Sequence, residues 1–67
     1  MNFILYDNSN GKIIQLRESA NIDSIGNMIL HVYGENPPAA ISCVPTEYQD
    51  FPQGKKIDLE TGLIVNA

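Results

Sequence analysis

The sequence predicts a small all-β fold, because its apolar residues occur in short runs rich in β-branched and aromatic side chains. Turn-forming residues separate these runs, as Gly34-Glu35-Asn36-Pro37-Pro38 does in the middle of the chain. A second observation is a pattern that occurs near each end: an apolar residue, Asp, three residues, Gly, one residue and two apolar residues. We therefore expect about three hairpins that form a curved sheet or a partly open barrel, with at most one short helical turn.

The repeated pattern spans residues 6–14 and 57–65. In each copy the Asp side chain can accept a hydrogen bond from the backbone two residues on, and the Gly can adopt the positive φ that closes a short hairpin loop. We therefore predict two structural turns, each built on one Asp and one Gly. The four turn residues are Asp7, Gly11, Asp58 and Gly62.

Two strands flank each of the three turns. They are expected at residues 3–6, 12–16, 28–33, 39–44, 56–58 and 63–65. The runs at 3–6 and 28–33 are almost continuously apolar instead of alternating, so both faces of these strands should be covered. In so short a chain we expect another subunit to supply the second cover.

Two remaining segments are not predicted to be strands. Asn21 is a fair N-cap, and Ile22, Ile25 and Ile29 fall at helical spacing. Gly26 and Asn27 interrupt the pattern before it completes three turns, so we expect a single turn or an irregular link. Residues 45–54 have the composition of a loop, and prolines toward both of its ends would prevent it from joining a central strand.

The length limits how the chain can be stabilised. Its 67 residues form one domain, and at this size folding hides only about 60% of the surface that the unfolded chain exposes. Cys43 is the only cysteine and His31 the only histidine, so an intramolecular disulfide and a Cys/His metal cluster are both excluded. Association with copies of itself or with another protein is the remaining source of stability.

The charge balance disfavours nucleic acid as a partner. Eight acidic and four basic residues give a net charge of −4, and a phosphate backbone would be repelled. The acidic residues are scattered too, whereas a mimic of nucleic acid needs a denser field. No apolar run is long enough to span a bilayer and no leader is recognisable, so we expect a protein made in the cytosol with no membrane partner.

Catalytic, cofactor and metal sites are not predicted. Asp7, Ser9 and Gly11 resemble the start of a calcium loop, but that loop needs Gly at its sixth position and here Gly is fifth. His31 has no Ser, Cys or carboxylate at a useful spacing, and Cys43 has no basic neighbour that would lower its pKa, so both are expected to be structural. We expect no enzyme activity and no cofactor.

The two ends of the chain resemble small tail-associated virion proteins of bacteriophages and prophages. Residues 2–14 (NFILYDNSNGKII) and 56–65 (KIDLETGLIV) are similar to the "YALYD-x-x-GKI" opening and the later "YVD-x-x-TGEIV" strand pair of that family, and together they cover about a third of the chain. The span 34–54, with four prolines, departs from the family. The resemblance implies a structural role in the virion, in the tail, the neck or the decoration of the particle.

We expect such a protein to act through exposed strand edges and an unpaired apolar face. The candidate interface residues are Phe3, Leu5, Ile29, Val32, Tyr48 and Phe51. Two other functions fit the same composition. One is a small phage-encoded inhibitor that binds a host defence protein, and the other is a barrel-type adaptor of a larger cellular assembly.

Overall fold

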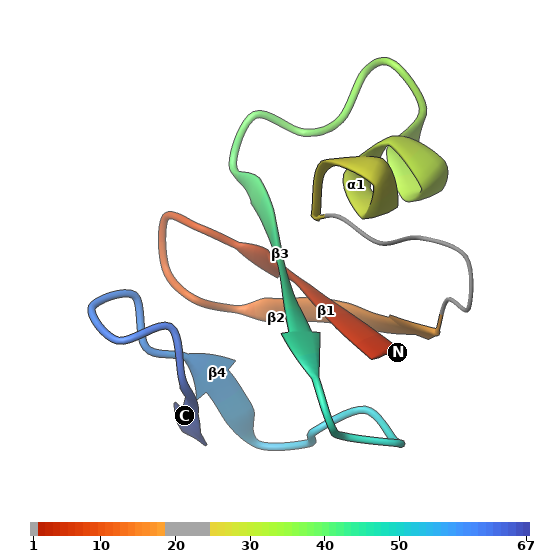
Figure 1. Ribbon diagram of the computed structural model, residues 1–67. Coiled ribbons are helices and arrows are strands. Elements are labelled where there is room, and N and C mark those ends of the chain that lie inside the picture. The colour runs from red at the N-terminus through yellow and green to blue at the C-terminus, as the bar shows by residue number, and fades with distance from the viewer. Residues whose placement is uncertain (1, 19–24) are drawn as a thin grey trace.

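The computed structural model describes residues 2–18 and 25–67, without the side chains of residues 25 and 26. Strands make up most of the regular structure in these residues (Figure 1). The mostly-strand class that the sequence predicts is therefore confirmed. The elements in chain order are β1 (Asn2–Asp7), β2 (Ile13–Glu18), α1 (Ile25–Tyr33), β3 (Ile41–Thr46), β4 (Lys55–Ile57) and β5 (Ile64–Asn66).

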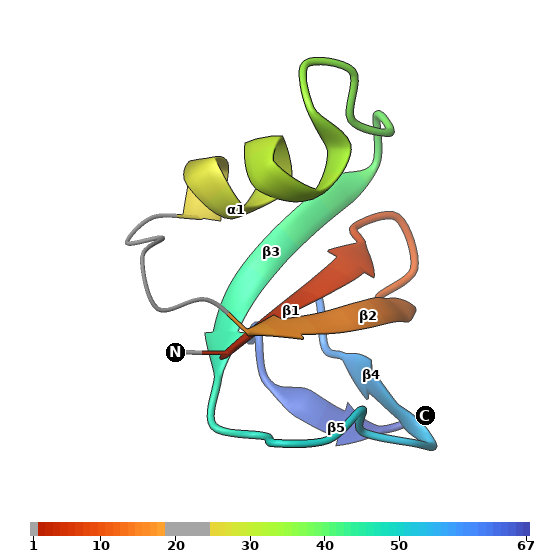
Figure 2. The same cartoon turned by 90° about the vertical axis from the view of Figure 1, so that its right-hand side faces the viewer.

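The strands form two antiparallel sheets. β1 is the centre of a three-stranded sheet of order β2-β1-β3, and β4 pairs with β5 in a second, two-stranded sheet. Figure 2 shows α1 over one face of the three-stranded sheet and the β4–β5 hairpin beneath the other. The continuous apolar run of β1 thus has both faces covered, as expected, but segments of the same chain provide both covers.

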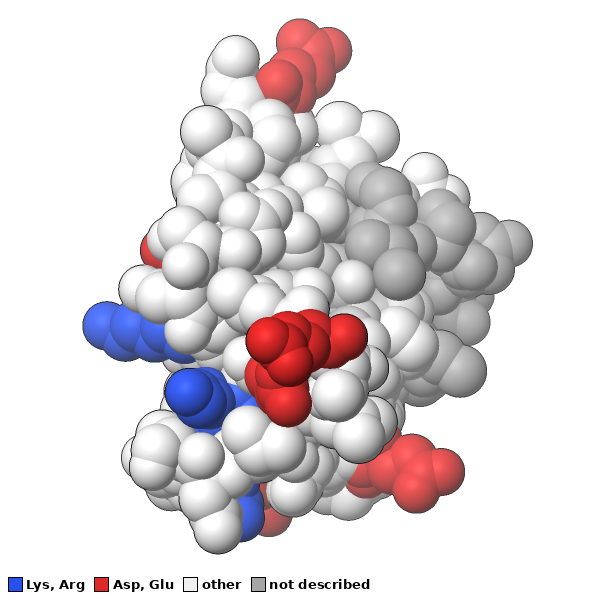
Figure 3. All heavy atoms as spheres, turned by 90° about the vertical axis from the view of Figure 1, so that its left-hand side faces the viewer, with Lys and Arg blue, Asp and Glu red and all other residues white. Residues whose placement is uncertain are grey.

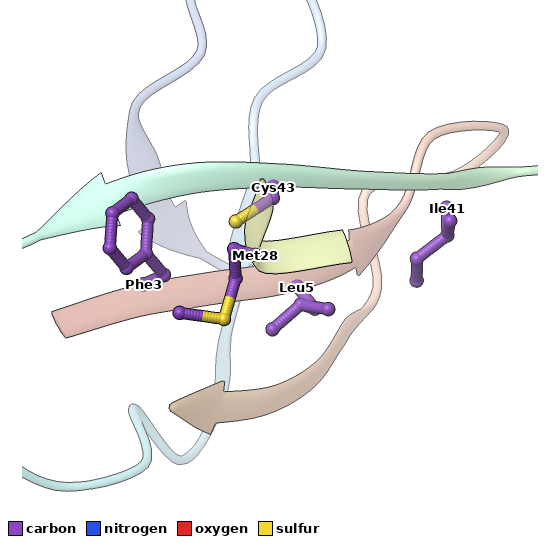
Figure 4. Close-up of a cluster of buried hydrophobic side chains, with 5 residues drawn as sticks. All are labelled: Phe3, Leu5, Met28, Ile41 and Cys43. Atoms are coloured by element: carbon purple, nitrogen blue, oxygen red, sulfur yellow. The ribbon is translucent and has the colours of Figure 1, made fainter. Parts of the chain in front are cut away.

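The face of the sheet beneath α1 holds the first of two buried clusters. Its members are Phe3, Leu5, Met28, Ile41 and Cys43. Figure 4 shows the Met28 side chain of α1 lying among the side chains that β1 and β3 contribute. Ile29, Val32 and Tyr33 of α1 pack against the same cluster and are partly buried. Helix and sheet therefore share one apolar layer.

The opposite face holds the second cluster, which joins the two sheets. Ile4 of β1, Ile13 of β2 and Ile57 of β4 are buried together, with Val44 and Ile64 packed against them. An isolated bridge pairs Lys12 with Lys56, and the Ile57 N–H donates to the Gly11 carbonyl at 2.8 Å. The C-terminal hairpin is thus fixed to the rest of the molecule both by apolar packing and by backbone pairing.

The expected strand at residues 28–33 is wrong, because this run lies in α1. Met28, Ile29, Val32 and Tyr33 face the sheet at helical spacing, while Leu30 on the other side is exposed. A short apolar run does not distinguish a buried strand from a buried helix by itself. The helix ends where Gly34 takes a φ of 70° and donates its N–H to the Leu30 carbonyl at 2.7 Å.

The middle hairpin is consequently wrong as well, and the nine residues of α1 exceed the single turn that was expected. The strand expected at 39–44 exists as β3, but it pairs with β1 instead of with residues 28–33. Both terminal hairpins are present, β1 with β2 and β4 with β5. Asn21 and Ile22, in which a helical turn was expected to begin, lie outside the described residues.

Candidate interaction surface

The two Asp-x-x-x-Gly corners have nearly the same geometry. The Asp7 carboxylate accepts the Ser9 N–H at 2.8 Å, and the Asp58 carboxylate accepts the Glu60 N–H at 3.0 Å. The Gly11 and Gly62 N–H groups donate to the carbonyls of Asp7 and Asp58, and these glycines have φ values of 81° and 76°. These are the Asx turn and the positive-φ glycine that the sequence predicts for each corner.

The corners differ in what surrounds them. Gly11 is buried against β4, and a Cβ placed on it would lie 2.1 Å from the Ile57 carbonyl oxygen. A Cβ on Gly62 would meet nothing within 4 Å. The first corner is therefore a docking point for the C-terminal hairpin, whereas the second corner projects into solvent.

The five strands follow one another around the molecule but do not close. Starting from β3, the order runs through β1 and β2 in the first sheet and then, across the bridge between Lys12 and Lys56, to β4 and β5. β3 and β5 are the two ends of this series, so each has one edge without a strand partner among the described residues. The gap between them is called the seam below.

A surface groove lies along the seam. Its lining comes from the end of β3 and the residues after it, from the start of β5, and from Asn2 and Glu18. The apolar and aromatic lining residues are Val44, Pro45, Tyr48, Leu63 and Ile64. Leu63 is 64% exposed and Tyr48 is 40% exposed, so the groove presents large apolar side chains to solvent. The seam is thus both an open strand edge and an apolar surface.

Hydrogen bonds hold the β3 side of the groove in place. The buried Asn2 side chain donates from Nδ2 to the Tyr48 carbonyl at 2.7 Å, and the Tyr48 N–H donates to Thr46 Oγ1 at 3.2 Å. On the β5 side, the Leu63 carbonyl accepts the Asp58 N–H at 2.8 Å. Both walls therefore have a defined backbone conformation in the free chain.

The charge of the groove is negative. Glu18 and Glu47 are the charged residues among those that line it. None of the four basic residues, all of which the structure describes, is among those that line it, although Arg17 is next to Glu18 on β2. Lys12, just before β2, pairs with Lys56 of β4, and Lys55 contacts Asn66 Oδ1. On the face in Figure 3, blue Lys and Arg side chains gather toward one side while red acidic side chains are spread out. A groove lined this way favours a positively charged partner.

The predicted interface residues fall into three groups. Phe3 and Leu5 lie in the interior beneath α1, so the expectation that they contact a partner is wrong for this fold. Ile29 and Val32 are half-buried against the same cluster. Tyr48 and Phe51 are exposed, and Tyr48 lines the groove.

Sequence reasoning missed Leu63 and Glu47 as candidate surface residues. The sequence places Leu63 in the apolar strand expected at 63–65, but it lies just before β5. Among the exposed large apolar side chains of the described residues, it is the most exposed. Glu47 follows directly on β3. The missing information was the strand order, because only that order makes the end of β3 and the start of β5 neighbours.

The structure places the two residues that were considered as reactive groups, Cys43 and His31. Burial raises the pKa of the Cys43 thiol to about 11, so this residue is a neutral part of the core and a poor nucleophile. His31 lies exposed on α1, outside the apolar strand in which it was expected. No three His, Cys, Asp or Glu side chains of the described residues come together to hold a metal ion, and no described helix could cross a membrane.

Comparisons with protein-family models, with curated proteins and with solved structures found no match for this chain.

Proposed function

We propose that the protein is a non-enzymatic assembly component of a phage virion, in the tail, the neck or the decoration of the particle. It acts through contacts with copies of itself or with a larger structural protein. The observation that carries the proposal is the pair of end motifs that resemble small tail-associated virion proteins. Both motifs fold as hairpins with matching Asp–Gly corners, so the residues of the resemblance belong to the framework of the domain.

The surface supports a role in protein–protein contact. Six large apolar side chains of the described residues are exposed, among them Leu63 and Tyr48 in one groove. Single exposed apolar residues are ordinary, but a group of them beside open strand edges is typical of an interaction site. A chain of 67 residues that already uses two apolar clusters to fold has little room for a catalytic pocket.

Quantitative mass spectrometry of purified particles tests the proposal. Particles would be prepared from the source phage, or from an induced culture of the source strain, and the copy number of the chain measured against that of a major structural protein. A fixed multiple such as three, six or twelve per particle is expected, because virion rings are symmetric.

The same experiment includes the lysate as its control. An inhibitor of a host defence protein would be abundant in the lysate and absent from purified particles. That result would overturn the assembly role and favour the inhibitor.

A further inference from the structure

We propose that the groove at the seam between β3 and β5 binds an extended segment of a partner protein, one that carries apolar side chains together with Lys or Arg. This rests on the proposed function and deepens it, because it names the surface used and the chemistry of the partner. Three properties of the seam support the proposal: its free backbone edges, its apolar lining and its charge.

The backbone edges are oriented for strand addition. The Asn8 N–H donates to the Ala40 carbonyl, which fixes the hydrogen-bonding pattern between β1 and β3. In this register the free backbone groups of β3, those that point away from β1, belong to Ile41, Cys43 and Pro45. On the other wall, the Asp58 N–H donates to the Leu63 carbonyl, so the backbone N–H and C=O groups of Ile64 and Asn66 point away from β4. An extended segment laid between these edges can form main-chain hydrogen bonds with both sheets.

Pro45 determines which of these edges gives most of the hydrogen bonds. Proline has no N–H, so at this position β3 offers a partner only a carbonyl. Ile64 on β5 offers both an N–H and a carbonyl. We therefore assign the main pairing to β5, with the end of β3 forming the opposite wall of the groove.

The lining supplies pockets for apolar side chains. Val44 and Ile64 are partly buried against the cluster that joins the two sheets, and they form the inner part of the groove. Tyr48 and Leu63 stand at its rim and are well exposed. A strand places alternate side chains on the same face, so a segment with apolar residues at every second position can reach these side chains.

Charge selects the partner. Glu18 and Glu47 line the groove, and the chain carries a net charge of −4. A second copy would bring the same net charge to this surface, so self-association there is opposed by repulsion. A segment with Lys or Arg is attracted, and it gains specificity from the two carboxylates.

A randomised library of displayed 12-residue peptides tests the assignment with the folded chain as bait. The expected binders alternate apolar residues with Lys or Arg, and their binding weakens as salt is added. Amide chemical-shift changes on titration with a selected synthetic peptide should centre on residues 44–49 and 62–64. The assignment is overturned if no binder is selected, if the binders lack basic residues, or if they shift a different surface.

Matched variants locate the binding site. Leu63→Ala should weaken binding of the selected peptide by about tenfold, since it removes apolar contact at the rim without changing the charge. Glu47→Lys should weaken it by about tenfold through the lost attraction. Leu30→Ala is the control, because Leu30 is similarly exposed, at 54%, but lies on α1. Equal effects of Leu63→Ala and Leu30→Ala on peptide binding would overturn the assignment.

The outcomes separate this inference from the proposed function. If the chain is present in particles at a fixed copy number but binds no basic segment at the seam, only the inference fails. If basic segments bind at the seam but the chain is absent from particles, the virion role fails and the binding surface stands.

Discussion

At the residue scale, Gly11 and Gly62 show how one turn pattern takes on two roles. Both have positive φ and both close an Asx turn, so both tolerate a side chain poorly. Gly11 also lies against the Ile57 carbonyl and accepts the Ile57 N–H. The first glycine therefore fixes the contact between the two sheets, which the second does not.

Alanine substitution at the two glycines separates backbone strain from the lost contact. Gly62→Ala should lower the free energy of unfolding by about 1–2 kcal/mol, the cost of alanine in the left-handed region. Gly11→Ala should cost about 3 kcal/mol or more, because β4 must also shift and the hydrogen bond between Ile57 and Gly11 is lost. A chain of this length has a total stability of about 3–10 kcal/mol.

Urea denaturation followed by circular dichroism measures both variants. The deciding quantity is the difference between the two variants in their loss of unfolding free energy. Losses that agree within about 0.5 kcal/mol would contradict the docking of β4 on Gly11.

Asp7 predicts a pH dependence at the first corner. The Ser9 hydroxyl, 2.5 Å from the carboxylate, followed by the Ser9 N–H and the charge of Lys12, lowers the pKa of Asp7 below its ordinary value of 3.8. Because the pKa is lower in the folded state, the contribution of Asp7 to stability is present above the unfolded-state pKa and is lost as the pH falls through the folded-state pKa.

An NMR titration of the Asp7 carboxyl carbon tests this. Ser9→Ala should move the pKa of Asp7 back toward 3.8, because it removes the largest cause and leaves the backbone donor in place. Asp7→Asn is a useful comparison, since it keeps an acceptor for the Ser9 N–H but cannot titrate. A pKa of 3.8 or above in the unmodified chain would refute the role given to Ser9.

At the element scale, α1 is where sequence and structure differ most. The turn residues and the terminal hairpins could be predicted because their causes are local: an Asx turn and a positive-φ glycine act within a few residues. The choice between strand and helix for residues 28–33 is not local, since it depends on the sheet face that α1 covers. The burial of Phe3 and Leu5 is not local either, because it depends on α1 covering their face of the sheet.

Met28 and Leu30 provide a test of that helix. Two positions apart, they would share a face of a strand, but on α1 they lie on different sides: Met28 is fully buried and Leu30 is 54% exposed. Met28→Ala should lower the free energy of unfolding by about 2–5 kcal/mol through the cavity it leaves. Leu30→Ala should change it by less than about 0.5 kcal/mol. Similar losses at both positions, measured by urea denaturation, would indicate a strand.

At the scale of the whole molecule, the chain is a strand series that stops short of closure. Segments of the same chain pack on both faces of β1, so the second cover that was expected from another subunit is supplied within the domain. The open seam then remains as a surface for a partner. A partly open barrel was among the expected shapes. That β3 and β5 border its opening, however, follows only from the strand order.

Site-specific photo-crosslinking in assembled particles tests the central claim most directly, namely that this domain joins a virion through its seam. A photoreactive phenylalanine analogue would replace Leu63 in one culture and Leu30 in another, and adducts in purified particles would be identified by mass spectrometry. An adduct between position 63 and a different virion protein, through a segment with Lys or Arg, is the predicted result, with none from position 30. An adduct from position 30 alone, or no adduct from position 63 in particles that contain the chain, would contradict it.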